Sequence, residues 1–154
     1  MELKTNVTAE EGKQFLTITR EFELPVELLF KAYVEPEIVE QWMGTKVMKL
    51  ESKRHGSYEF VTTDPKGNKH PFSGTIHEFT ENRRIKRTFE MEGTPYGVQL
   101  EVLEFSALTD ETSKLRMHVV FESVDQRDQL LKMPFKQGIN FAHDRLEGIL
   151  KKHK

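Results

Sequence analysis

Five polar side chains on the predicted strands have the chemistry needed for acid–base catalysis: His77, Arg87, Glu90, Glu104 and His118. An acid and a base inside an apolar cavity acquire shifted pKa values and can assist enolisation or ring closure. We take His118 with Glu104 or Arg87 as the candidate catalytic set. The alternative is that these side chains point to solvent, because the strands of a one-sided sheet alternate between polar and apolar residues. We favour this second interpretation.

Metal and cofactor sites are not indicated. The chain contains no cysteine, which excludes a disulfide framework and a zinc–thiolate site. Its six histidines include no pair two or four residues apart, and no phosphate loop or nucleophile-elbow motif is present. We therefore expect no metal and no cofactor. We also expect His143 and Asp144, in the last predicted helix, to form a solvent-facing pair.

Basic residues gather at positions 53–55 and 83–87. The whole chain has 23 Lys and Arg against 25 Asp and Glu, a formal charge of −2, which gives no general attraction to nucleic acid. We interpret the second cluster as a charged sheet edge. No window approaches the ~20 apolar residues of a membrane span, and no signal peptide opens the chain. We expect a cytoplasmic protein without nucleic-acid or membrane partners.

The elements that must position such side chains begin at residues 18–44, which predict a strand followed by two short helices. Pro25 suits a first helical position, and Pro36 ends that helix near Glu35. The second helix ends at Gly44, which can cap it. The apolar residues of the first helix repeat at helical spacing: Val26, Leu29, Phe30 and Tyr33.

From residue 46 the hydrophobic pattern changes to a period of two, which is typical of strands. The expected strands are 46–52, 56–63, 69–80, 84–91, 98–108 and 115–123. Turn residues at 64–68 predict a hairpin. In the following strand we place Phe72 and Ile76 on one face, and His77 and Phe79 on the other. Short turns between successive strands require an antiparallel sheet.

Helical spacing returns near the C-terminus. A short helix is expected at Asp125–Lys132, capped by Ser123 or Asp125, and a long one follows Pro134. The apolar stripe of the long helix contains Phe135, Ile139, Ala142, Leu146, Ile149 and Leu150, with Phe141 on one flank. We predict one α+β domain over residues 1–154, in which a curved antiparallel sheet of about six to seven strands wraps around this helix. Residues 1–14 are expected to form a loose N-terminal extension.

A sheet curved around a helix leaves space between the two, and apolar spaces of this kind often hold small molecules. Aromatic and methionine residues, Tyr33 among them, are numerous enough to line it, and methionine adapts to varied ligands. The predicted ligand-binding residues are Trp42, Phe60, Phe72, Phe89, Met117 and Phe141. The alternative, a core filled by these side chains, stays open.

Seven short motifs occur in an order and spacing seen in a known superfamily. They are Thr19–Phe22, Leu29–Tyr33, Pro36–Val39, Gln41–Gly44, Gly56–Tyr58, Asp64–Gly67 and Phe72–Ile76. Through them, residues 15–152 resemble the helix-grip (START-like, SRPBCC) superfamily, in the branch homologous to activators of heat-shock protein 90 ATPase. The resemblance implies the helix-grip fold and a cytoplasmic protein with a stress- or chaperone-associated role.

Three functions follow as hypotheses. The first is non-enzymatic binding of a small hydrophobic molecule between sheet and helix. The second, implied by the resemblance, is a chaperone partner whose ATPase the protein stimulates. The third is a cyclase or dehydratase that uses the catalytic set above. One fold hosts many activities, so the fold alone does not choose among them. The ligand is not readable from the sequence, and monomer and homodimer both remain open.

Overall fold

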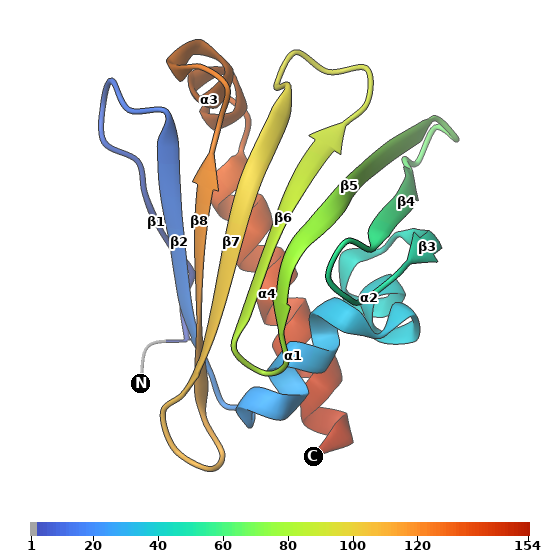
Figure 1. Cartoon of the computed structure of the whole chain (residues 1–154), viewed down its shortest axis with the longest axis vertical. Coiled ribbons are helices and arrows are strands. Elements are labelled where there is room, and N and C mark those ends of the chain that lie inside the picture. The colour runs from blue at the N-terminus through green and yellow to red at the C-terminus, as the bar shows by residue number, and fades with distance from the viewer. Residues whose placement is uncertain (1–2) are drawn as a thin grey trace.

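Eight strands form a single antiparallel sheet, one face of which is covered by helix α4 (Figure 1). The computed structural model describes residues 3–154. The strands are β1 Asn6–Thr8, β2 Phe15–Phe22, β3 Lys46–Leu50, β4 Ser57–Thr63, β5 Lys69–Thr80, β6 Arg84–Met91, β7 Val98–Ala107 and β8 Ser113–Val120. The helices are α1 Val26–Val34, α2 Pro36–Met43, α3 Val124–Leu131 and α4 Phe135–Leu150, with a short 3-10 turn at Lys151–His153.

The strand order is β1-β2-β8-β7-β6-β5-β4-β3, with every neighbouring pair antiparallel. The predicted α+β helix-grip architecture is therefore confirmed. The predicted strand number is wrong, because the sheet has eight strands rather than six or seven. The additional strand is β1, which lies in the segment expected to be a loose extension and pairs with β2 from Asn6 opposite Thr19. Three residues are too few to show a period of two.

Two prolines and a glycine set the limits of α1 and α2. Pro25 is the residue before α1, one position earlier than predicted, and Pro36 is the first residue of α2. Gly44 adopts the left-handed conformation (φ 64°) and its N–H donates to the Glu40 carbonyl at 3.2 Å, as the capping role requires. The indole N–H of Trp42 donates to the Ala32 carbonyl at 2.6 Å, which fixes α2 against α1.

Alternating residues of the long strands form the core under α4. Leu16 and Ile18 of β2 and Leu115 and Val119 of β8 are buried, as the period of two predicts. The expected position of Phe79 on the opposite face is wrong, because Phe79 packs against the core, where its ring lies 5.5 Å from that of Phe30. The register of β5 with β6 shifts between residues 76 and 78. A bulge adds one residue, and this reverses the alternation.

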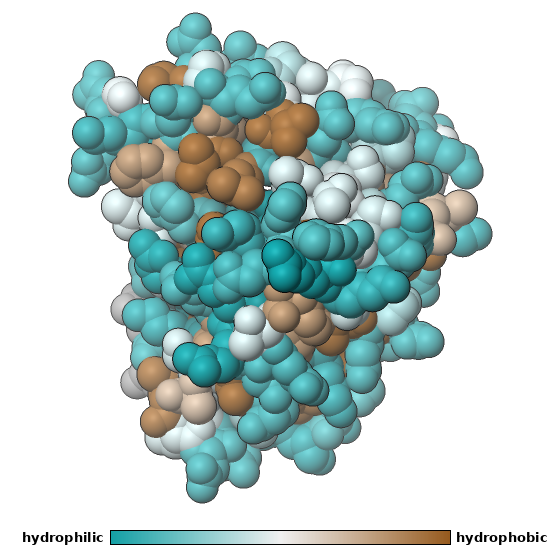
Figure 2. Space-filling view, viewed as in Figure 1, coloured by the Kyte–Doolittle hydropathy of each residue, from teal (hydrophilic) through white to brown (hydrophobic). Residues whose placement is uncertain are grey.

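The other face of the sheet is charged. Glu104 of β7 bonds Arg84 at 3.2 Å and Arg116 at 2.9 Å, and all three side chains are more than one-third exposed. Figure 2 shows hydrophilic residues over most of the side seen in Figure 1, with hydrophobic residues in a few groups. Such pairs contribute little to stability. Within residues 3–154, no helix is both long and apolar enough to cross a membrane.

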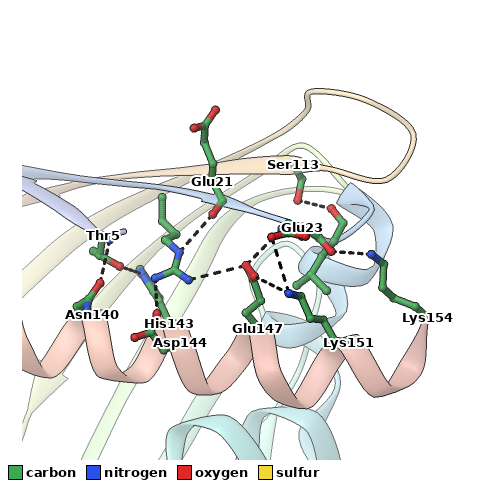
Figure 3. A network of polar contacts seen from close by, with 12 residues as sticks. Thr5, Glu21, Glu23, Ser113, Asn140, His143, Asp144, Glu147, Lys151 and Lys154 are labelled. Carbon is green, nitrogen blue, oxygen red and sulfur yellow. Dashed lines mark hydrogen bonds and ion pairs between the residues drawn. The ribbon is translucent and has the colours of Figure 1, made fainter. Parts of the chain in front are cut away.

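Polar contacts hold the C-terminal half of α4 against β1 and β2 (Figure 3). The guanidinium of Arg20 is 2.8 Å from the Asp144 carboxylate and 3.8 Å from that of Glu147. The Arg20 and Glu147 side chains are 2% and 6% exposed. Glu147 also accepts from the Glu23 N–H at 3.3 Å and lies 3.6 Å from the Lys151 ammonium. These contacts satisfy a buried charge from several sides, as burial of a charge requires.

The same side of α4 is tied to the start of β1. The Thr5 N–H donates to the Asn140 side chain at 2.9 Å, and the Thr5 hydroxyl lies 2.7 Å from Nδ1 of His143. We call the residues of both groups the α4 clamp: Thr5, Arg20, Asn140, His143, Asp144 and Glu147. The clamp joins the last helix to Thr5, the residue before β1, and to Arg20 of β2 (Figure 3).

The prediction that His143 and Asp144 form a solvent-facing pair is wrong for His143. Asp144 is 57% exposed, but His143 is fully buried and its ring lies 5.6 Å from that of Phe22. Burial lowers the pKa of His143 from 6.5 to about 3, and the charge of Arg20 adds to this decrease. The imidazole is therefore neutral in the folded protein at physiological pH.

Candidate functional site

A mainly apolar cavity of about 280 Å³ lies between the sheet and the helices. Strands β2, β6, β7 and β8 form one wall, and all four helices contribute to the other. Half-buried Phe135, Ile139 and Ala142 of α4 close the cavity on the helix side. The rest of the lining is Leu16, Ile18, Tyr33, Trp42, Met43, Arg87, Phe89, Met91, Gln99, Glu101, Met117, Val119, Phe121 and Leu130.

The lining of the cavity includes an ion pair. Arg87 of β6 and Glu101 of β7 are register partners across the two strands. Nε of Arg87 lies 2.9 Å from Oε1 of Glu101, and the side chains are 11% and 9% exposed. The pair brings no net charge into the cavity. Because both ions had to leave water, such a pair is weak evidence for stability and a better indication of a polar subsite.

The guanidinium of Arg87 also rests on the ring of Tyr58, with 5.1 Å to the centroid. Tyr58 can lie across β5 because residue 74 is glycine: a Cβ at that position would be 2.6 Å from the Tyr58 hydroxyl. The hydroxyl donates to the Thr88 carbonyl. The orientation of Arg87 is therefore fixed by a carboxylate on one strand and an aromatic ring on another.

Tyr33 of α1 also lines the cavity. Its ring contacts Trp42 at 5.2 Å and Phe105 at 5.5 Å between centroids, and α1 presents it on the stripe that the sequence predicts. The hydroxyl is buried and has no hydrogen-bond partner within residues 3–154. Burial raises the pKa of Tyr33 above its ordinary value, the charge of Arg87 opposes the rise, and that of Glu101 adds to it.

The predicted ligand-binding residues separate into three groups. Trp42, Phe89 and Met117 line the cavity. Phe60 and Phe72 are buried in the core, with ring centroids 5.3 Å apart, and are not part of the lining. Phe141 is 67% exposed, so its predicted position facing the interior is wrong. Successive residues of a helix are rotated by about 100° around its axis, so a residue at the flank of the apolar stripe, such as Phe141, can point to solvent while its neighbour faces the interior.

The candidate catalytic residues are not brought together. Arg87 lies in the cavity lining, whereas Glu104 pairs with Arg84 and Arg116 on the charged face of the sheet. His118 is half-buried, contacts the Thr17 hydroxyl at 3.2 Å through Nδ1, and does not line the cavity. The three residues therefore do not form one site.

Sequence reasoning missed Glu101 and Gln99, which do line the cavity. The signal was present in β7, where both share the alternation of buried Leu103 and Phe105. A charged residue in a buried register is easily assigned to the wrong face, because charged side chains are almost never fully buried unless paired. Among the described residues, no group of three or more His, Cys, Asp or Glu side chains could hold a metal ion.

Comparison with solved structures identifies bacterial proteins of the same fold. Protein Ms6760 from Mycobacterium smegmatis is 22% identical, with a TM-score of 0.84 and 96% of each chain covered. A protein from Rhodobacter sphaeroides is 19% identical, with a TM-score of 0.86 over 97% of this chain and 99% of the other. Protein NE0264 from Nitrosomonas europaea is 24% identical, with a TM-score of 0.78 over 91% and 96%. At these identities the likeness shows the fold alone.

A comparison with curated proteins gave no match. The family model described as "Activator of Hsp90 ATPase homolog 1-like protein" matches residues 23–151. That span runs from the residues before α1 to the end of α4, and it contains most of the cavity lining. The chain therefore belongs to the Activator of Hsp90 ATPase homolog 1-like family.

Proposed function

We propose that this protein binds a small, mainly apolar molecule in the cavity under α4. The observation that carries the proposal is the character of the cavity: a mainly apolar lining that contains an ion pair and a tyrosine whose hydroxyl is buried without a partner among residues 3–154. Ligand sites typically combine apolar walls with a few polar groups, in volumes of roughly 300–1,000 Å³. The cavity here, about 280 Å³, lies at the lower end of that range, which favours a compact ligand.

Packing supports the proposal as well. Protein interiors are packed about as densely as organic crystals. Phe60 and Phe72, whose rings lie in contact in the core, show such packing. Side chains that line a cavity have fewer packing partners on one side, so a bound molecule would gain contacts with them. The cavity also adjoins the half of α4 in which no residue is fully buried, so entry of a ligand would disturb few core contacts.

The test is a thermal-shift and native mass-spectrometry screen with small aromatic and aliphatic molecules. Ala142→Trp would fill the cavity from α4 and should abolish any shift found with wild type. Phe141→Trp, at the neighbouring exposed position, is the matched control and should bind as wild type does. A screen without a single stabilising molecule, or unchanged binding by Ala142→Trp, would contradict the proposal.

The family description provides a second candidate, stimulation of the ATPase of heat-shock protein 90. Such an activity would act through an outer surface rather than the cavity. Addition of the protein should then raise the ATPase rate of the chaperone, and Ala142→Trp should raise it equally. No change in rate at saturating protein would count against this function.

An acid–base enzyme finds less support. Of the predicted set, only Arg87 lies in the cavity, and its guanidinium is occupied by Glu101 and the Tyr58 ring. A general base must reach the proton that it abstracts, and His118 is outside the lining.

A further inference from the structure

Tyr33 lines the cavity, and its hydroxyl is a buried hydrogen-bonding group without a partner among residues 3–154. Buried polar groups in folded proteins nearly always have a partner, so an exception calls for an explanation. The other buried tyrosine of this region, Tyr58, follows the rule by donating to the Thr88 carbonyl. Tyr33 therefore differs from its neighbour in the one respect that a ligand could correct.

Two aromatic side chains pack against the ring of Tyr33. Trp42 and Phe105 pack against the ring edge to face, with centroids 5.2 Å and 5.5 Å away. Trp42 is itself held by its bond to the Ala32 carbonyl. The donor is thus pre-positioned, and a bound molecule would not have to immobilise it.

The charges in the cavity limit what that molecule can be. Arg87 and Glu101 compensate each other at 2.9 Å, and Arg87 is also covered by the Tyr58 ring. An anion would add an unpaired negative charge beside Glu101, and a cation would add one beside Arg87. Burial of an unpaired charge is strongly unfavourable. Burial also raises the pKa of the Tyr33 phenol, so this group stays protonated and remains a donor.

We propose that the ligand is uncharged and carries one carbonyl or hydroxyl oxygen that accepts a hydrogen bond from Tyr33, while the remainder of the molecule is apolar. This inference rests on the proposed function, since it names the chemical class of ligand for the same cavity. Gln99, which is 4% exposed and lines the cavity, offers a neutral amide as a further polar contact. The site therefore distinguishes ligands by charge and by the presence of one acceptor.

Three probes of matched size test the inference: butylbenzene, butyrophenone and 4-phenylbutyrate. Dissociation constants are measured by calorimetry for the wild type, Tyr33→Phe and Tyr58→Phe. In the wild type we expect butyrophenone to bind about tenfold more tightly than butylbenzene, the value of one net hydrogen bond, and 4-phenylbutyrate to bind most weakly. Tyr33→Phe should bind the ketone and the hydrocarbon equally. Tyr58→Phe, whose hydroxyl is outside the lining, should retain the preference.

The outcomes separate this inference from the function on which it rests. Equal binding of ketone and hydrocarbon by wild type, or tightest binding of the carboxylate, would overturn the inference and leave the cavity as a ligand site. A ketone preference that survives in Tyr33→Phe would also overturn it. If wild type binds none of the three probes and no molecule of the wider screen, the inference and the proposed function both fall.

Discussion

The two halves of α4 are packed in different ways. In the C-terminal half, His143, Leu146, Glu147 and Leu150 are buried, and this half contains every α4 residue of the clamp except Asn140 (Figure 3). In the N-terminal half no residue is buried, and Phe135 and other half-buried side chains face the cavity. One helix is therefore packed tightly at one end and borders the cavity at the other.

The buried hydroxyl groups of the two regions differ as well, since that of Thr5 has a partner and that of Tyr33 has none. In the clamp, the Thr5 hydroxyl contacts Nδ1 of His143, whose Nε2 has no partner among residues 3–154, and the charge of Arg20 is met by Asp144 and Glu147. In the cavity, the Tyr33 hydroxyl has no partner among residues 3–154. Stability and binding place opposite demands on packing, and regions that bind ligands are drawn from the less stable parts of a fold. The difference teaches that α4 meets both demands by separating them along its length.

The largest effect is expected from Arg20→Met, which breaks the clamp. Glu147 would keep Lys151 but lose the buried guanidinium 3.8 Å away. Removal of one partner of a buried pair leaves an uncompensated charge, so the free energy of unfolding should fall by about 3 kcal/mol in urea titrations. Arg116→Met, which removes a half-exposed partner of Glu104, is the control and should cost less than about 1 kcal/mol. Equal losses would show that the clamp does not hold the helix.

A second pair of variants compares the two halves directly. Leu146→Ala removes a fully buried side chain of α4 and should lower the free energy of unfolding by about 3 kcal/mol. Ile139→Ala removes a half-buried side chain that already adjoins the cavity, so the loss should be about 1 kcal/mol. Both are read from urea unfolding at neutral pH. A larger loss for Ile139→Ala would reverse the comparison.

The clamp should also make stability depend on pH. The pKa of His143 is lowered in the folded state to about 3, so as the pH falls below about 6.5 only the unfolded state takes up this proton. The folded state is then disfavoured between about pH 6.5 and 3. Wild type should lose on the order of 2 kcal/mol more than His143→Gln between pH 7.5 and 4.5. His153→Gln, at an exposed position, should follow wild type in urea unfolding at each pH; parallel profiles for all three proteins would contradict the prediction.

The smallest effects concern two buried hydroxyls and should have opposite signs. Thr5→Val removes the partner of His143 and should destabilise the fold by about 1–2 kcal/mol, because the imidazole is left unpaired. Tyr33→Phe removes a hydroxyl without a partner and should stabilise the ligand-free protein by up to about 1 kcal/mol. Unfolding by urea measures both. A clear loss of stability in Tyr33→Phe would mean that its hydroxyl is satisfied.

The comparison also shows where sequence reasoning succeeded. The stripe that presents Tyr33, the helix start at Pro36 and the cap at Gly44 were all predictable, because each depends on residues within about one helical turn. The face of Leu115 and Val119 followed from alternation within one strand. Three of the six predicted ligand-binding residues line the cavity for the same reason, since their elements and faces were correctly placed.

Failures occurred where a neighbour distant in sequence decides the outcome. The polar His143 was assigned to solvent, yet Thr5, 138 residues earlier, provides its partner. Glu101 is buried because Arg87 lies opposite it on the adjacent strand. Phe79 faces the core because of a register shift against β6, which no alternation within β5 reveals.

Local backbone preferences and hydrophobic periods were sufficient to predict the elements, the antiparallel sheet and the helix that it clasps. These properties depend on steric effects and burial among residues near in sequence. Which polar groups are buried with partners, and which atoms, such as the Tyr33 hydroxyl and Nε2 of His143, are left without, was decided by the tertiary structure. The physical reason is that the cost of burying a charge or a hydroxyl depends on groups brought beside it from distant strands and helices.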